Sequence, residues 1–175
     1  MTGVQTCALP IYLSELSPVD TSITAGVSDP EGWYVNLDPQ GTYTYDENLN
    51  GTTADDVARS YNAERVITDP VAAPSQSAVY FTTFQPYNDL CAIGGKTFIW
   101  ALQYDTGGSA VQNLTGTALI QVSTGSIEQV ALKTAFTQKG NRRTGAMEGL
   151  PPTTQGLNLM TAPPPAKKVL HIREK

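Results

Sequence analysis

The run DENLNG at residues 46–51 is the segment of this chain whose residue types and spacing best fit a defined chemistry. It matches the opening of a calcium-binding loop, D-x-[DN]-x-[DN]-G, in which oxygen ligands at alternating positions converge on one cation and the glycine allows a sharp turn. The match is partial, because Val57 stands at position twelve, where such loops carry a bidentate glutamate. The same residues favour a solvated turn between two strands, so both interpretations stay open. The candidate calcium ligands are Asp46, Asn48, Asn50 and Asp55.

The histidine and cysteine content disfavours nucleophilic catalysis and transition-metal binding. His171 is the only histidine, Cys91 is the only cysteine apart from Cys7, and no G-x-S-x-G nucleophile motif occurs. One histidine and one cysteine cannot complete a tetrahedral metal shell. We therefore expect no enzyme activity. For Cys91, a buried thiol and one half of a disulfide to sequence outside this chain are both compatible with the residue type.

The densest basic cluster is KGNRR at residues 139–143, on a chain that is otherwise acidic. Such a cluster could dock an acidic protein partner, and more often it forms a solvated loop. A packing or ion-pair role for Arg142 and Arg143 is a third interpretation. The cluster alone does not choose among them.

Composition limits the class of protein. A chain of 175 residues is long enough for one domain with a real core. Its net charge of −5, its pI near 4.7 and its 15% of charged residues argue against a protein that binds nucleic acid by neutralising phosphates. The abundance of Thr, Ser, Gly, Asn and Pro is typical of all-β proteins with turn-rich surfaces.

Residues 1–11, MTGVQTCALPI, resemble the translation of a sequencing-library adapter, so we expect them to be an artefact and the genuine fragment to begin near Tyr12. They contain neither a cationic n-region nor an apolar run long enough for a signal peptide or a membrane span. We expect a folded region over residues 12–148. Residues 149–175, which begin with a proline-rich stretch, are expected to form an extended, poorly paired connector followed by a terminal strand.

The elements that must position these residues are short β-strands, because no segment shows a convincing apolar period of 3.6. In the run from Thr97 to Tyr104, large rings alternate with other apolar residues, so both faces of that strand require burial. The sequence DTGG at residues 105–108 predicts a tight reversal immediately after it. The predicted strands are Trp33–Leu37, Arg65–Thr68, Ala78–Phe84, Thr97–Tyr104, Ala118–Val122, Glu128–Leu132 and Lys168–Ile172.

Several segments together resemble the C-terminal β-propeller region of the PilC/PilY1 family of type IV pilus assembly and tip adhesin proteins. They are GWYVNL (32–37), AERVITDPVAA (63–73), VYFTTFQP (79–86), DLCAIGGKTFIWALQYDTGG (89–108) and NRRTGAMEGLPP (141–152). The resemblance covers residues 31 to the end, and its specificity comes from the combination and order of the motifs.

This resemblance implies an all-β partial propeller of about one to two quinoprotein-like blades. It also implies a surface or pilus location in a Gram-negative bacterium. The implied role is non-enzymatic and covers pilus assembly, the balance between pilus extension and retraction, and adhesion. The implied partners are pilin, minor pilins and a host or abiotic surface, and calcium is the implied cofactor. An isolated pair of blades should leave apolar faces and strand edges uncovered, so we expect such a fragment to fold poorly alone.

Two other functions remain as alternatives. Quinone-dependent dehydrogenases share this blade architecture and stack their cofactor on an aromatic ring, for which Trp100 and Phe98 would be the candidates. Packing between sheets is the structural explanation for the same rings. The other alternative is a general β-propeller binding scaffold of the cell envelope.

Overall fold

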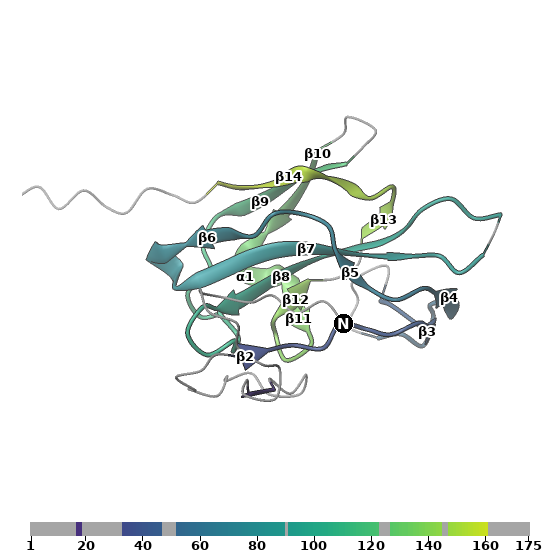
Figure 1. Ribbon diagram of the computed structural model, residues 1–175, viewed down its shortest axis with the longest axis horizontal. Coiled ribbons are helices and arrows are strands. Elements are labelled where there is room, and N and C mark those ends of the chain that lie inside the picture. The colour runs from purple at the N-terminus through teal and green to yellow at the C-terminus, as the bar shows by residue number, and fades with distance from the viewer. Residues whose placement is uncertain are drawn as a thin grey trace, which may run out of the picture.

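The computed structural model describes residues 17–18, 33–46, 52–89, 91–122, 127–144 and 147–160. These residues form mostly antiparallel sheets with almost no helix (Figure 1). The strands are β1 (Ser17–Pro18), β2 (Trp33–Tyr34), β3 (Gly41–Tyr43), β4 (Arg59–Tyr61), β5 (Arg65–Val66), β6 (Val71–Ala73), β7 (Ala78–Pro86), β8 (Gly95–Gln103), β9 (Thr117–Val122), β10 (Ile127–Ala131), β11 (Phe136–Gln138), β12 (Arg143–Thr144), β13 (Met147–Gly149) and β14 (Pro152–Met160). Two short helical turns, η2 (Pro74–Gln76) and α1 (Leu132–Ala135), complete the described elements.

A long hairpin of β7 and β8 is the centre of the fold. Its pairs run without a break from Ala78 opposite Gln103 to Pro86 opposite Gly95. The short strands β5 and β6 pair with the outer edge of β7, whereas β12 and β13 pair with the outer edge of β8. Beyond them, β11 pairs with β12. Both strands of the hairpin therefore have neighbours on each side along most of their length.

Three smaller sheets surround this hairpin. The strands β10, β9 and β14 form an antiparallel sheet in that order, which lies above the hairpin in Figure 1. At the opposite end of the chain, β3 pairs with β4, and β1 runs parallel to β2. Among the described residues, no helix is long and apolar enough to cross a membrane.

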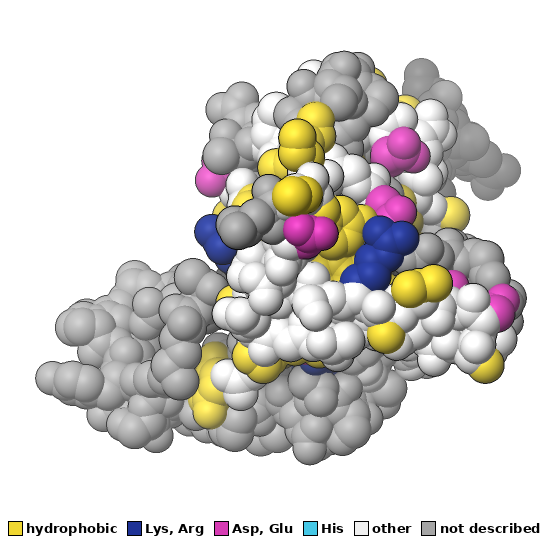
Figure 2. All heavy atoms as spheres, turned by 90° about the vertical axis from the view of Figure 1, so that its right-hand side faces the viewer, with side chains coloured by type: hydrophobic (Ala, Val, Ile, Leu, Met, Phe, Trp, Pro, Cys, Tyr) yellow, Lys and Arg dark blue, Asp and Glu magenta, His cyan; other side chains and the backbone are white. Residues whose placement is uncertain are grey.

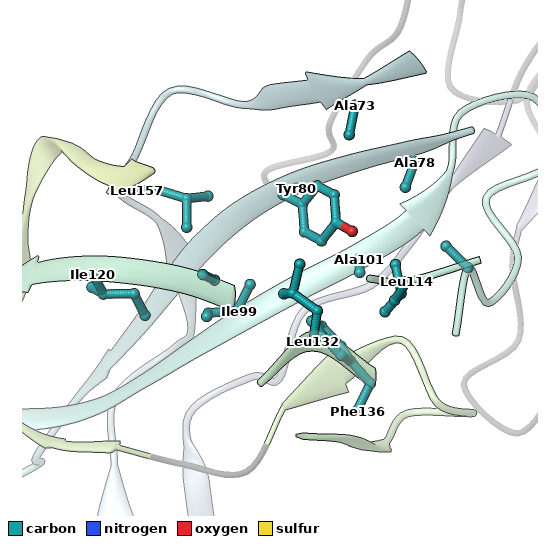
Figure 3. Packing of buried hydrophobic residues seen from close by; sticks show 12 residues of the cluster. Ala73, Ala78, Tyr80, Ile99, Ala101, Leu114, Ile120, Leu132, Phe136 and Leu157 are labelled. Carbon is teal, nitrogen blue, oxygen red and sulfur yellow. The ribbon is translucent and has the colours of Figure 1, made fainter. Parts of the chain in front are cut away.

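Both faces of the β7–β8 hairpin are buried by other parts of the same chain. One face carries Tyr80, Ile99 and Ala101, and Figure 3 shows side chains of β9, α1 and β14 gathered beside it. The other face carries Phe81 and Trp100, whose rings stack with centroids 5.9 Å apart and are covered by residues that include Trp33. Each large apolar side chain buried in this way stabilises the fold by about 1.5–3 kcal/mol.

The prediction that the Trp100 strand is buried on both faces is confirmed, and so is the all-β class. The covering layers, however, come from within this chain, and the sheets formed by the described residues do not close into a ring. On the hairpin the expected apolar exposure is therefore not found. The exposed large apolar side chains among the described residues are Val57, Ile93, Tyr104, Ile127 and Met160. Among the described strands, β10 and β14 are the two edges of the sheet β10–β9–β14.

Six of the seven predicted strands exist, with shifted bounds, in β2, β5, β7, β8, β9 and β10. The seventh, Lys168–Ile172, and the suspected adapter at residues 1–11 lie outside the described residues. The expected reversal at residues 105–108 is confirmed, since Gly107 adopts φ +65° and Leu102 forms an antiparallel bridge with Ser109. A Cβ at Gly107 would lie 2.5 Å from Cδ2 of Trp33, so this close approach also requires glycine.

The expectation of a poorly paired connector after residue 149 is wrong for its first part. β14 (Pro152–Met160) pairs antiparallel with β9, with Leu157 opposite Ile120 and Met160 opposite Thr117. Its register shifts between Pro152 and Leu157, a stretch that contains Gly156, where an added Cβ would lie 2.7 Å from the carbonyl oxygen of Gln121. Leu157 is buried in the apolar cluster on the hairpin face that carries Tyr80 and Ile99, which is the physical reason that this polar segment becomes a strand.

Candidate functional site: a buried ion-pair network beside a surface pocket

Arg143 forms the centre of a network of buried charges on the Trp100 face of the hairpin. Its Nη1 lies 2.9 Å from Oδ2 of Asp38 and 3.0 Å from Oε2 of Glu64. These three residues retain only 3%, 7% and 4% of their solvent exposure, respectively. The Lys139 ammonium also contacts Oδ1 of Asp38. A buried charge is tolerated when it is paired and hydrogen-bonded, and this arrangement meets both conditions.

Glu64 connects the network to the hairpin and to the segment after β2. Its Oε2 accepts the backbone N–H of Asp38 at 3.0 Å. Its Oε1 accepts the indole N–H of Trp100 at 3.1 Å and the hydroxyl of Thr83. The Glu64 carboxylate thus joins β7, β8 and the Asp38 segment. Its ion pair with Arg143 also connects β12 to these elements.

The Arg143 guanidinium also lies over aromatic rings. Its central carbon is 4.0 Å from the ring centroid of Phe98, 5.6 Å from that of Trp100 and 5.8 Å from that of Tyr45. Such cation–π contacts add about 0.5–2 kcal/mol when they are desolvated. A planar guanidinium meets the rings and the carboxylates at once, which a lysine ammonium would not do.

The electrostatics of Asp38 follow from these contacts. Burial alone would raise the pKa of its carboxyl group, but the Arg143 guanidinium and the Lys139 ammonium outweigh this effect and lower the pKa below its usual value. Asp38 is therefore held as a carboxylate at neutral pH.

A second polar arrangement lies at the end of the molecule that carries β3, β4 and β13. Lys96, fully buried on β8, places its Nζ 2.8 Å from Oε1 of Glu148, which also accepts the hydroxyl of Tyr87 at 2.9 Å. The hydrogen bond from Lys96 is the main cause of the lowered pKa of Glu148. Figure 2 shows basic, acidic and hydrophobic side chains side by side at this end.

A surface pocket of about 400 Å³ opens beside the Arg143 network. Its lining comes from the segment after β3, from Thr53, and from β11, β12 and the turn between them. The lining residues are Thr44, Tyr45, Asp46, Thr53, Thr137, Gln138, Lys139 and Arg143.

The calcium candidates are only partly described. Asp46 lines the pocket and Asp55 is exposed, whereas Asn48 and Asn50 lie outside the described residues. Within the described part of the chain, no three Asp, Glu, His or Cys side chains are grouped as a metal site would require. Calcium binding remains a prediction.

The solvated-loop interpretation of the basic cluster is wrong. Arg142 is fully buried and its Nε donates to the Lys139 carbonyl at 2.8 Å, while Arg143 and Lys139 pair with carboxylates. The ion-pair interpretation is confirmed. The interpretation of Cys91 as a buried thiol is also wrong, since this free cysteine is exposed in the turn between β7 and β8.

The two rings that a stacked cofactor could use are enclosed by protein. Trp100 and Phe98 have no solvent exposure, and Phe81 and the Arg143 guanidinium lie against them. A quinone could stack on either ring only after this packing opened.

No family model, curated protein or solved structure matches this chain.

Proposed function

We propose that this chain is a non-enzymatic structural module of a type IV pilus assembly and adhesion factor, similar to the C-terminal propeller region of the PilC/PilY1 family. In this proposal its sheets are about one to two blades of a larger propeller at the surface of a Gram-negative bacterium. Pilin and minor pilins are its partners, and the parent protein also contacts a host or abiotic surface. In the same proposal, calcium modulates the module through the region of Asp46.

The observation that carries this proposal is the meeting of separate motifs at one network. Four of the segments that resemble the family contribute Glu64, Thr83, Trp100 and Arg143, and these side chains bond to one another. A resemblance that arose by chance in unrelated turns would not be expected to place its residues in one buried cluster. This convergence supports a common scaffold role.

The decisive experiment removes the codons for residues 33–160 from the chromosomal gene and measures surface pili by shearing and electron microscopy, together with surface motility. We expect fewer pili and reduced motility. The matched control is a Thr42→Val allele, because Thr42 is exposed on β3 and its hydroxyl bonds to the exposed Ser60 hydroxyl on β4. Normal piliation in the deletion strain, with the truncated parent present at its usual level, would refute the proposal.

A separate assay addresses the enzyme alternative. The full-length parent protein, incubated with pyrroloquinoline quinone and calcium, is tested for dye-linked oxidation of alcohols. We expect no turnover, because Trp100 and Phe98 are enclosed by protein. Turnover that disappears in a Trp100→Leu variant would establish the dehydrogenase instead.

A further inference from the structure

The strand β10 is an edge of the sheet β10–β9–β14. On one side it pairs with β9 in an unbroken register, from Ile127 opposite Gln121 to Ala131 opposite Thr117. Among the strands that the structure describes, none pairs with its other side. Its residues are exposed except for Val130, which is half-buried. An edge of this kind offers its outward N–H and C=O groups to a further strand.

The other edge of the same sheet, β14, is protected against such pairing, whereas β10 is not. Soluble proteins protect their edge strands with proline, lysine and irregularities of register. β14 contains Pro152 and a register shift between Pro152 and Leu157. β10 has the sequence IEQVA, without proline or lysine, and its register with β9 is regular. This contrast identifies β10 as the edge that can accept a strand.

The sequence of β10 favours a second copy of itself as that strand. When two copies pair antiparallel with Gln129 opposite Gln129, the whole strand takes part, because Gln129 is the middle residue of β10. In this register Glu128, the one charged residue of β10, lies opposite Val130 of the second copy. A register centred on Glu128 would be shorter and would place two carboxylates opposite each other, which is destabilising.

The side chains that meet in the full register are compatible. Buried Ile120 marks the core face of the sheet and pairs with Glu128. Ile127, Gln129 and Ala131 therefore lie on the outer face. Across the two-fold axis, Ile127 meets Ala131 of the second copy, and the two Gln129 amides can bond to each other. Ile127 is 58% exposed in the single chain, so this pairing removes apolar surface from water.

We propose that two copies of this chain form a dimer through antiparallel pairing of their β10 strands, with Gln129 at the two-fold axis. The two three-stranded sheets then join into one, and the symmetric contact closes without leaving a further β10 edge. Because the paired strands are short, the interface is small, and we expect a dissociation constant of about 10 μM. The dimer goes beyond the proposed function and does not depend on it, since any protein that carries this sheet could use the edge.

Sedimentation velocity of the full chain over a range of about 1–300 μM tests the dimer. We expect the mass to rise from 18.7 kDa at low concentration towards twice that value. Gln129→Lys should weaken association by about fivefold or more, because it sets two ammonium groups opposite each other. Gln129→Glu should do the same with two carboxylates. An equimolar mixture of these two variants should restore association, because unlike charges then face each other.

Asn158→Lys is the matched control. Asn158 is exposed on β14 and pairs with Leu119 on one side of β9, while Gln129 pairs with Leu119 on the other side. The control therefore places a lysine in the same row on the opposite edge and should leave association unchanged, and circular dichroism verifies that each variant keeps its fold. The proposal is overturned if the chain stays monomeric over the whole range, if Asn158→Lys prevents association and Gln129→Lys does not, or if the mixed Gln129 variants fail to associate.

Discussion

Arg143 and Glu64 stand 79 residues apart in the sequence, yet Nη1 of Arg143 lies 3.0 Å from Oε2 of Glu64. The contact joins β12 to the segment before β5 through the face of the hairpin that carries Trp100. Asp38 completes it from the N-terminal side, 105 residues away from Arg143. Three distant parts of the chain are therefore fixed to the hairpin by one guanidinium.

Arg143→Ala should lower the free energy of unfolding by about 3–5 kcal/mol, because it leaves Asp38 and Glu64 buried without their shared cation. Urea denaturation at pH 7 measures the effect. Arg59→Ala is the matched control, since Arg59 is about half exposed and lies 3.8 Å from Glu148, so its loss should cost about 0–1 kcal/mol. Equal effects of the two variants would mean that the buried network does not stabilise the fold.

Stability should fall in acid partly through Asp38. The pKa of this carboxyl group lies below its usual value of 3.8 in the folded chain, so its contribution is fully present above that pH. It is lost as the pH falls through the lowered pKa, because the folded state must then take up a proton that the unfolded chain already holds. Asp38→Asn should therefore destabilise the chain at pH 7 and much less at pH 2, as urea midpoints would show. A stability difference that stays constant with pH would contradict this assignment.

Gly107→Ala should destabilise the chain by more than about 2 kcal/mol, from the left-handed backbone at φ +65° and from the contact with Trp33. Thermal unfolding followed by tryptophan fluorescence measures it. Combining the change with Trp33→Leu tests the steric part, since a smaller side chain makes room for the new methyl group. The double variant should be more stable than the sum of the single effects predicts, and strict additivity would mean that the backbone conformation alone is responsible.

Leu157→Ala should cost about 2–5 kcal/mol, the range for removing a buried leucine side chain. Leu157 lies on β14, pairs opposite Ile120 and is only 5% exposed. Asn158→Ala on the same strand is the control, because Asn158 is exposed and its change should cost less than about 0.5 kcal/mol. Urea unfolding of both variants decides whether β14 belongs to the core. A negligible effect of Leu157→Ala would mean that this segment is a loosely packed connector and not a core strand.

The sequence predicted the central hairpin well because its signal is local. Large rings alternate along β8, β7 is rich in β-branched and aromatic residues, and DTGG follows β8 directly. The short strands β1, β3, β4, β6, β11, β12 and β13 escaped prediction, because two or three residues carry no period of their own. The equally short β2 and β5 were found only as parts of longer predicted runs. β14 escaped because its burial depends on β9 and its composition of Pro, Thr and Gln is typical of a loop.

The sequence analysis identified the basic residues of the buried network but not its carboxylates. Its basic side was identified as the cluster at residues 139–143, and an ion-pair role was one of the interpretations. The carboxylates of Asp38 and Glu64 escaped because nothing in a linear pattern reports pairing across 79 to 105 residues. The sequence around Glu64 carries no local signal of burial either, because the charged residue Arg65 follows it directly.

The sequence separations within this network bear on how the chain folds during synthesis. Asp38 and Glu64 leave the ribosome 105 and 79 residues before Arg143. At an elongation rate of about 5–20 residues per second, roughly 4 to 20 s pass before their counterion exists. Until then, burial of these two carboxylates would cost free energy because they have no counterion. This cost delays closure of the N-terminal segment over the nascent hairpin. A chaperone that binds aromatic strands would meet the Trp100 face of this polypeptide in the last part of that interval, after Trp100 itself has been made.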